Sequence, residues 1–297
     1  MEILLNTNEF GYKPFLKYPI ETIVVGLKNF CHNQFYCVTQ KQLPALIKEL
    51  EQNQKKLCLS INLFASEKQI IKLDKILDQL LNLEIDTFIV SDLGVLNLFK
   101  KRNLQNKVTL DLQTYVTNKY SARSLLNFGV KKVVLSKEIT LNDIKEISNY
   151  NSEHIEILCQ GYYPITYSKR PILSCYYKNF RLKKNKNIHY IKEESRNSKY
   201  ILIEQNNLLT VYNNTQYSLF SYLDILYKNN ITKLRIDTNF MSIEEIDSYI
   251  YFYTKAIKFI KENNFNEYEK LKKEFNNKFI YETPFLHTES FLLKEGK

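Results

Sequence analysis

The fold is decided by residues 107–160, KVTLDLQTYVTNKYSARSLLNFGVKKVVLSKEITLNDIKEISNYNSEHIEILCQ. The stretch contains three short apolar, β-branched runs, at 107–113, 131–137 and 154–160. Segments long enough for helices, at 118–128 and 141–149, separate these runs. Gly129 follows the first segment, where a glycine favours the end of a helix. A strand followed by a helix, repeated in this way, predicts parallel strands joined by helical crossovers.

The same alternation extends over most of the chain. Eight strand-like runs occur in all, and they begin at Glu2, Thr22, Lys56, Asp86, Lys107, Lys131, His154 and Thr232. Further helix-length segments lie between them, at 39–54 and 67–83. Eight such units favour an α/β fold of the (β/α)8 TIM-barrel type, because eight parallel strands close naturally into a barrel. An open, doubly wound sheet is the alternative.

One interval between predicted strands is too long for a single crossover. The seventh strand ends near Gly161 and the eighth begins near Thr232. We expect a small β-rich insertion on the C-terminal rim of the barrel, with strands at 200–204 and 208–213, a basic run at 181–186 and a crossover helix at 219–228. The predicted organisation is one barrel domain over 1–278, with an inserted rim segment at 162–216, followed by a C-terminal tail at 279–297.

The predicted strands alternate between apolar and polar residues, and the polar set should face the barrel interior because the outer face must meet helices. This places Asn62, Gln113, Gln160 and Asn239 near the C-terminal mouth, with Asp111 and Asp237 one layer deeper. Asp92 and Glu138 follow the fourth and sixth strands and join the rim. Arg235 and Glu156 lie deepest, and an unpaired buried charge is costly. We therefore expect Arg235 to form a buried ion pair with Glu156 or with an aspartate.

Composition limits the class of protein. The net charge of +10 and pI near 9.1 favour an anionic partner such as nucleic acid, although abundant Lys, Asn, Ile and Tyr would also follow from an AT-rich genome. An odd number of cysteines, five, argues against a secreted domain built on disulfides. No run reaches the ~18 apolar residues of a membrane span, and no leader pattern opens the chain. These features predict a soluble, cytoplasmic protein.

Common catalytic motifs are absent from the sequence. It contains no G-x-S-x-G, H-E-x-x-H, G-x-x-x-x-G-K or G-x-G-x-x-G pattern, which argues against serine hydrolases, zinc proteases and standard nucleotide-binding folds. The histidines are His32, His154, His189 and His287, and their scatter favours surface or structural roles. Cys31 and His32 are adjacent, and neighbouring residues do not easily face one another as a nucleophile and its base.

Four segments, in order along the chain, resemble peptidase family U32, the collagenase-like peptidases. They are VVGLKNF at 24–30, DLQTYVTNKYSARSLLNFGVKKVVLSKEITLNDIKEI at 111–147, IEILCQGYYPITYSKRPIL at 155–173 and LRIDTNFMSIEEIDSYIYFYTKAI at 234–257. The resemblance implies the barrel fold. It also implies a role in hydroxylation, since family members are associated with 5-hydroxyuridine at the tRNA wobble position, with a ribosomal RNA cytidine and with ubiquinone synthesis.

The resemblance also implies a departure from the family pattern. Members of this kind hold an iron–sulfur cluster through cysteines in a pattern like H-G-x-x-C-x-x-Y-S-G-x-C. The matching segment here begins at Gln160, and its two cysteine positions are Pro164 and Pro171. Proline offers no thiolate, so we expect no metal and no cofactor on this chain. The S-K-R-x-x-L form is similar to a small, cluster-free branch that is often encoded beside a second U32 protein, which implies a heterodimer with a paralogue.

These observations favour a protein that acts in RNA base hydroxylation, on a tRNA wobble uridine or on ribosomal RNA. The expected ligand and RNA-binding residues are Asn62, Gln113, Gln160, Tyr167, Ser168, Lys169 and Arg170, with Tyr167 stacking and the two cations meeting phosphate or carboxylate groups. The first alternative is a peptidase in which Glu138 or Asp237 is catalytic and assists the attack of water. The second alternative is a binding or scaffold protein without chemistry of its own.

Overall fold

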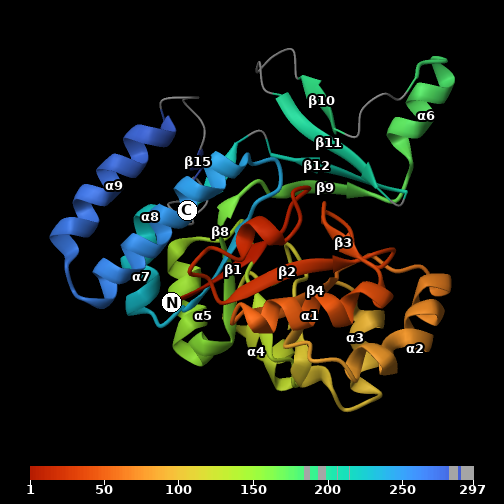
Figure 1. The fold of residues 1–297 in the computed structure, drawn as a ribbon, viewed down its shortest axis with the longest axis horizontal. Helices are drawn as coiled ribbons and strands as arrows, with labels where there is room; N and C mark the ends of the chain where they lie inside the picture. Colours follow the sequence, from red (N-terminus) through yellow and green to blue (C-terminus); the bar gives the residue numbers. More distant parts are fainter. Residues whose placement is uncertain (184–187, 193–198, 206, 214, 281–286, 289–297) are drawn as a thin grey trace.

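The eight predicted strands close into a parallel barrel in the computed structural model, which describes residues 1–183, 188–192, 199–205, 207–213, 215–280 and 287–288 (Figure 1). The barrel strands are β1 (Glu2–Asn6), β2 (Thr22–Leu27), β4 (Lys56–Ile61), β5 (Thr87–Val90), β6 (Val108–Leu110), β7 (Lys132–Val134), β8 (Ile155–Gly161) and β14 (Lys233–Asp237). Closure occurs at β14, where Lys233 pairs with Glu2 of β1 and with Glu156 of β8. The predicted TIM-type barrel is confirmed, and the open sheet is excluded.

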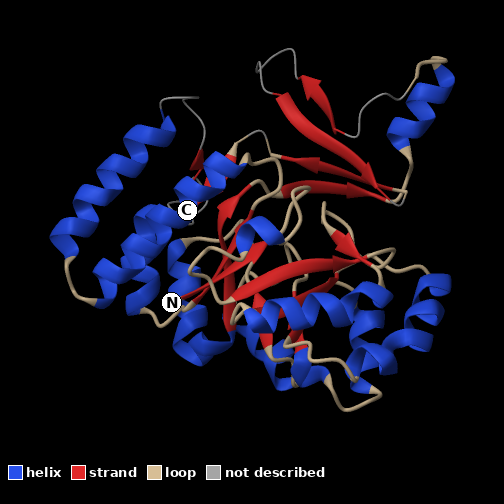
Figure 2. Cartoon of the chain, viewed as in Figure 1, coloured by secondary structure: helices blue, strands red, loops and turns tan. Residues whose placement is uncertain are grey.

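Helices surround the barrel (Figure 2). Those that connect or follow barrel strands are α1 (Leu43–Gln52), α2 (Glu67–Leu81), α3 (Leu93–Lys100), α4 (Lys119–Asn127), α5 (Leu141–Asn151), α7 (Leu223–Lys228) and α8 (Ile243–Lys261). Local sequence sets several of their starts. Asp92 accepts hydrogen bonds from the N–H groups of Gly94 and Val95 at the beginning of α3, and Ser242 forms a capping box with Glu245 at the start of α8.

The main core lies between the outer face of the barrel and the helices. Leu57, Leu59 and Ile61 of β4 point into it, as the alternation predicts. A small second cluster, formed by Leu4, Val24, Cys58 and Ile89, fills the opposite face of four neighbouring strands. The C-terminal helix α9 (Phe265–Ile280) packs beside α8 through aromatic rings, and Phe275 stacks on Phe220 with a centroid distance of 3.9 Å. Among the described residues, no helix has the length and apolar character needed to span a membrane.

The insertion forms a separate antiparallel sheet, the rim sheet, in the order β10 (Ile188–Lys192), β11 (Lys199–Gln205), β12 (Leu208–Tyr212) and β9 (Pro164–Ser168). Figure 1 shows this sheet lying across one end of the barrel, with α6 (Ile172–Asn179) projecting away from it. The strands predicted at 200–204 and 208–213 are therefore confirmed. Part of the predicted basic run, 184–186, lies outside the described residues.

Two short strands extend the barrel sheet on the side of β8. Strand β13 (Gln216–Ser218) pairs antiparallel with β8, and β15 (His287–Thr288) pairs parallel with β13. On the other side, β3 (Cys37–Val38) pairs with the end of β2. Most of the predicted tail, 279–297, lies outside the described residues. The mouth of the barrel is reached by the ends of β1 and β14, by the loops after β2, β4, β6, β7 and β8, and by β9 and β12 of the rim sheet.

Candidate functional site at the barrel mouth

A layer of paired charges fills the barrel below its mouth. The Nη1 atom of Arg235 donates to Asp111 Oδ2 at 2.8 Å, and its Nε donates to Glu156 Oε1 at 2.7 Å. Lys132 Nζ contacts the other oxygen of Glu156 at 3.0 Å. Burial alone would raise the pKa of Glu156, but Arg235 and Lys132 outweigh it and hold that pKa below its ordinary value. The predicted buried ion pair is confirmed, and two carboxylates share the guanidinium.

Asp237 lies above this layer and lines the mouth. Its Oδ1 accepts the N–H of Asn239 at 3.0 Å, and its Oδ2 accepts from Asn6 Nδ2 at 3.1 Å. Burial raises the pKa of Asp237 to about 6, because these neutral donors and the more distant cations only partly offset the loss of water. Asp237 can therefore gain or lose a proton near neutral pH, which suits acid–base chemistry.

The rim sheet is tied to the mouth through Tyr167 on β9. Its hydroxyl donates to Gln113 Oε1 at 3.1 Å and accepts from Asn33 Nδ2 at 3.3 Å. Gln113 Oε1 also accepts from Lys137 Nζ at 2.9 Å.

The backbone of Gln113 has φ +62°, a conformation that non-glycine residues seldom adopt. Burial also lowers the pKa of Lys137, so two ionisable groups at the mouth are shifted toward their neutral forms.

The cavity under the rim sheet, the mouth cavity, is small. It encloses about 40 Å³, between Asp237, Asp111 and Lys137 below and Tyr167 and Tyr212 above. A cavity needs roughly 10–15 Å³ of this kind of space to hold a water molecule, so the mouth cavity has room for a few waters. A nucleobase or a peptide does not fit in the mouth cavity while the rim sheet is in this position.

The remaining predicted ligand residues lie at different heights around this cavity. Asn62 lines it, and its Oδ1 accepts the backbone N–H of His32 at 3.1 Å. Ser168 sits in β9, where its Oγ accepts the N–H of Arg170 at 3.2 Å. Lys169 lies outside the cavity and reaches the carbonyl of Ala65 at 3.4 Å, and Arg170 is exposed. Lys169 and Arg170 therefore stand on the outer rim.

Gln160 does not face the mouth, contrary to the prediction from alternation. The pairing of β8 with β14 shifts, so that Arg235 opposes Leu158 while Ile236 opposes Gln160. This irregularity turns Gln160 out of the barrel, where its amide donates to Gln216 at 2.7 Å and accepts from Tyr253 of α8. A side chain on Gly161 (φ +136°) would collide with the Asp237 carbonyl oxygen, which explains glycine at this exit.

Glu138, the other predicted catalytic residue, is exposed and is not among the described residues that line the mouth cavity. Its backbone N–H donates to Ser136 Oγ at 3.2 Å. Of the two carboxylates predicted for the peptidase alternative, only Asp237 faces the mouth cavity. The catalytic role of either residue stays a prediction.

Sequence reasoning set aside the loop after β2, which brings Cys31 and His32 beside the mouth, next to Cys37 of β3. His32 is only 2% exposed and stacks on Phe64 with a centroid distance of 4.7 Å. The Sγ atoms of Cys31 and Cys37 lie 3.0 Å apart. No periodic pattern in the sequence marks these residues, because the loop gains its position through long-range contacts such as the bond from Asn239 Nδ2 to the carbonyl of Asn33.

An iron–sulfur cluster does not fit the residues at this exit. Pro164 lines the mouth cavity and Pro171 precedes α6, and neither offers a ligand atom. Cys159 is fully buried outside the barrel, and burial raises the pKa of its thiol well above the ordinary value. Cys175 is exposed on α6. Within the described part of the chain, no three His, Cys, Asp or Glu residues are placed to hold a metal ion.

Comparison with known proteins gives several relatives. An uncharacterized protease of Methanocaldococcus jannaschii is 32% identical over 165 residues, which are 54% of this chain and 40% of the relative. The tRNA hydroxylation protein P of Helicobacter pylori strain 26695 is 31% identical over 121 residues, 40% of this chain and 29% of that protein. The matched regions are thus less than half the length of these two relatives.

The tRNA hydroxylation protein P2 of Bacillus subtilis matches more evenly, with 23% identity over 226 residues that make up 74% of this chain and 73% of the relative. The family model of peptidase family U32 matches residues 10–294, which include the rim sheet and every barrel strand except β1. The resemblance read from the sequence is confirmed, and the chain belongs to peptidase family U32.

Proposed function

We propose that this protein acts in the hydroxylation of an RNA base, with tRNA as the first RNA to examine. The observation that carries the proposal is the match to the Bacillus subtilis tRNA hydroxylation protein P2, which spans 73% of that protein and 74% of this chain. Shorter matches to tRNA hydroxylation proteins of Helicobacter pylori and Escherichia coli support the same assignment.

The charge and the mouth of the barrel are consistent with this proposal. A net charge of +10 favours association with a polyanion. Lys169 and Arg170 on the outer rim can contact phosphates, while Tyr167 and Gln113 provide an aromatic ring and an amide at the entrance. In this arrangement the outer rim recognises the RNA, and Asp237 offers a carboxyl group that titrates near neutral pH.

The proposal includes a partner subunit, a U32 paralogue with cysteine ligands. Hydroxylation of a base requires an oxidant and usually a metal or organic cofactor, and the residues at the exit of β8 do not fit the family's cluster. This chain would then bind and position the RNA while the paralogue supplies the redox centre. A tagged copy should co-purify with the paralogue at equal amounts, and its isolation as a monomer from cells that express both would contradict the partnership.

Nucleoside mass spectrometry of a deletion strain tests the function. We expect hydroxylated uridine and its derivatives to disappear from digested tRNA and to return when the wild-type gene is supplied on a plasmid. Ribosomal RNA digested in parallel identifies the alternative substrate, through the loss of hydroxylated cytidine. An unchanged profile in both RNA fractions would contradict the proposal.

Peptide hydrolysis is the second candidate, because Asp237 has a raised pKa and faces the mouth cavity. With the rim sheet displaced from the mouth cavity, the ionised carboxylate of Asp237 would act as a general base for water attack on a peptide bond. Purified protein incubated with gelatin and peptide libraries, with and without divalent cations, should yield fragments that are absent for Asp237→Asn. Intact substrates under all of these conditions would exclude this candidate.

A further inference from the structure

The segment 169–183, which we call the basic arm, carries a large share of the protein's positive charge. It consists of the turn after β9, helix α6 and the four residues that follow α6. Its five cations are Lys169, Arg170, Lys178, Arg181 and Lys183. No Asp or Glu occurs in the sequence from 157 to 192, so half of the net charge of +10 lies in this short segment. A general enrichment in lysine does not explain the local absence of acids.

Two contacts hold α6 against the rim sheet. Glu204 of β11 accepts the backbone N–H of Leu173 at 2.9 Å, and the hydroxyl of Tyr177 lies 3.0 Å from His189 Nδ1 of β10, within hydrogen-bond distance. From this base the helix projects beyond the sheet (Figure 1). Because Glu204 already accepts from the N–H groups at the start of α6, an anion would have to be bound by the side chains of the arm.

Three cations of the arm are available to a partner. Lys178, Arg181 and Lys183 are exposed, and no carboxylate among the described residues forms an ion pair with them. Arg102, in contrast, already pairs with Asp74 and Asp78 on the barrel surface. Exposed cations without a nearby carboxylate keep their full attraction for a polyanion.

The arm also exposes aromatic rings among these cations. Ile172, Tyr176 and Phe180 follow one another at intervals of four residues, which places them along one side of the helix. Tyr176 is 50% exposed and Phe180 is 64% exposed, and their ring centroids lie 4.7 Å apart with the planes tilted by 43°. Exposed rings beside cations form the kind of surface on which unpaired nucleobases stack while phosphates meet positive charge.

We propose that the basic arm binds an unpaired segment of an RNA, with Tyr176 and Phe180 stacking on bases and the cations after them contacting phosphates. The inference rests on the proposed function for the identity of the polyanion as RNA. It adds a binding surface on a helix that projects away from the rim sheet, so the arm holds a part of the RNA other than the base at the barrel mouth (Figure 1). The charge alone would also suit an anionic membrane or an acidic protein, and the pair of exposed rings favours nucleic acid.

The salt dependence of RNA binding tests the cations. A fluorescently labelled, unmodified tRNA transcript is titrated with the full chain at several concentrations of KCl. Each phosphate contact to a single strand contributes roughly 0.7 to the slope of log K against log salt concentration. Combined substitution of the three cations should therefore make this slope shallower by about 2. The variant is Lys178→Gln, Arg181→Gln and Lys183→Gln.

A second triple variant controls for the loss of net charge. It removes three exposed lysines from α1, α2 and α9, through Lys48→Gln, Lys75→Gln and Lys273→Gln. Both triple variants lower the net charge by three, but the control should keep the slope of the wild-type protein. Equal slopes for the two variants would show that the arm makes no contacts of its own, which would overturn the proposal.

Replacement of the two rings tests stacking separately from charge. Tyr176→Leu with Phe180→Leu keeps apolar side chains but removes both aromatic faces, so it should weaken binding of the transcript at least tenfold and leave the salt slope unchanged. Tyr150→Leu with Tyr251→Leu is the matched control, because these rings are 49% and 53% exposed on α5 and α8. The control should bind like the wild-type protein. Full affinity of the variant at 176 and 180 would contradict the assignment of stacking to the arm.

Two further probes separate RNA from other partners. Vesicles that contain phosphatidylserine should bind the wild-type protein and the variant at 176 and 180 equally. If this variant loses vesicle binding but keeps its affinity for the transcript, the arm is a membrane contact and the proposal fails. The proposal also fails if the variant no longer co-purifies with the paralogue while its affinity for the transcript is unchanged, because the arm would then bind protein.

The outcome for the basic arm can be distinguished from the outcome for the proposed function. If a deletion strain loses hydroxylated nucleosides and the arm variants both restore them and bind the transcript like wild type, the arm assignment fails while the function stands. If the deletion strain keeps its modified nucleosides but the arm variants lose affinity for the transcript, the arm stands as an RNA-binding surface and the proposed function fails.

Discussion

The deep layer of the barrel and the layer at its mouth differ in the kind of polar group that they bury, charged side chains that pair with one another below, and amide and imidazole groups that are only partly paired above. In the deep layer, the charges of Arg235, Asp111, Glu156 and Lys132 all have partners within 3.0 Å. At the mouth, His32 has no partner for its ring nitrogens, and the side-chain oxygens of Asn6 and Asn239 lack donors in the described part of the chain. The difference indicates that the deep layer stabilises the barrel, whereas the mouth has hydrogen-bonding capacity left for a ligand or for water.

Arg235→Met should have the largest effect on stability. It leaves Asp111 and Glu156 buried near each other with only Lys132 in direct contact, and breaking a buried pair in this way costs about 3–5 kcal/mol. Urea denaturation should show that loss in the free energy of unfolding.

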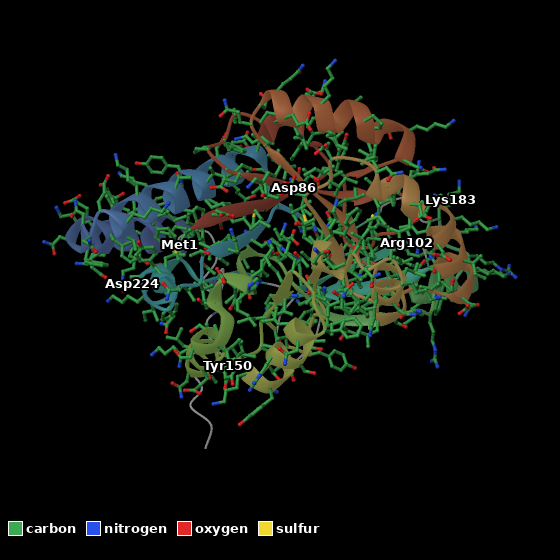
Figure 3. All side chains as sticks on the ribbon, turned by 90° about the horizontal axis from the view of Figure 1, so that it is seen from below. Met1, Asp86, Arg102, Tyr150, Lys183 and Asp224 are labelled. Atoms are coloured by element: carbon green, nitrogen blue, oxygen red, sulfur yellow. The ribbon has the colours of Figure 1, made fainter. Side chains whose placement is uncertain are left out.

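Arg102→Met is the matched control for this prediction. Arg102 pairs with Asp74 and Asp78 on the surface, where it is labelled in Figure 3, and these carboxylates are 46% and 70% exposed. Exposed pairs contribute about 0–1 kcal/mol, so the control should lose little stability. Equal losses in the two variants would mean that the deep layer has no special structural role.

Asp237→Asn should stabilise the protein at neutral pH and not in acid. The folded pKa of about 6 lies above the ordinary value of 3.8, so the folded state binds a proton more tightly than the unfolded state. The free energy of unfolding therefore falls as pH rises from about 4 to about 6. The substitution removes this cost.

The expected gain at pH 7.5 is about 1–3 kcal/mol, since one pKa unit corresponds to about 1.4 kcal/mol and Asp237 is not completely shielded from solvent. Thermal unfolding at about pH 4 and pH 7.5 measures it, with wild type and variant converging at the lower pH as the linkage requires. A variant that is less stable than wild type at pH 7.5 would show that Asp237 is instead held ionised by the cations below it.

Tyr167→Phe should loosen the rim sheet by about 1 kcal/mol, the contribution of a typical hydrogen bond. The hydroxyl of Tyr167 links β9 to Gln113 and Asn33 of the barrel loops. Hydrogen exchange should become faster at the amides of β9 and β12, while the barrel strands keep their protection. Tyr120→Phe, which alters a ring that is 73% exposed, is the control. Unchanged exchange in β9 would mean that other contacts hold the sheet over the mouth.

The smallest effect on stability is expected from oxidation of the thiols of Cys31, in the loop after β2, and Cys37, in β3. The hydrogen bond from Cys31 lowers the pKa of the Cys37 thiol, and the two Sγ atoms are 3.0 Å apart. Diamide, which accepts two hydrogens, should convert this pair to a disulfide and reduce the mass by two hydrogen atoms. Cys37→Ser should lose this internal mass change, and Cys175→Ser should keep it. An oxidised mass that persists in Cys37→Ser would assign the reaction to other thiols.

Local pattern was sufficient to predict the barrel and the chemistry of its deep layer. The eight apolar runs became its eight strands, and alternation along 154–160 and 232–239 brought Arg235 toward Glu156. Both predictions depend on short-range regularities, namely the repeat of strand and helix and the two-residue period of a strand. The prediction from alternation fails at Gln160, where the two-residue period is interrupted. The interruption comes from a shift in the pairing of β8 with β14, which the sequence of β8 alone does not reveal.

The sequence by itself determined the fold class and the family, because both follow from residue types at fixed spacings. Only the tertiary structure decided that the rim sheet closes the mouth cavity and that His32 lies in a separate pocket with Phe64 and Lys169. These residues are far apart in the chain, and long-range packing brings them together. No local sequence pattern predicts which loops will meet at the end of a barrel.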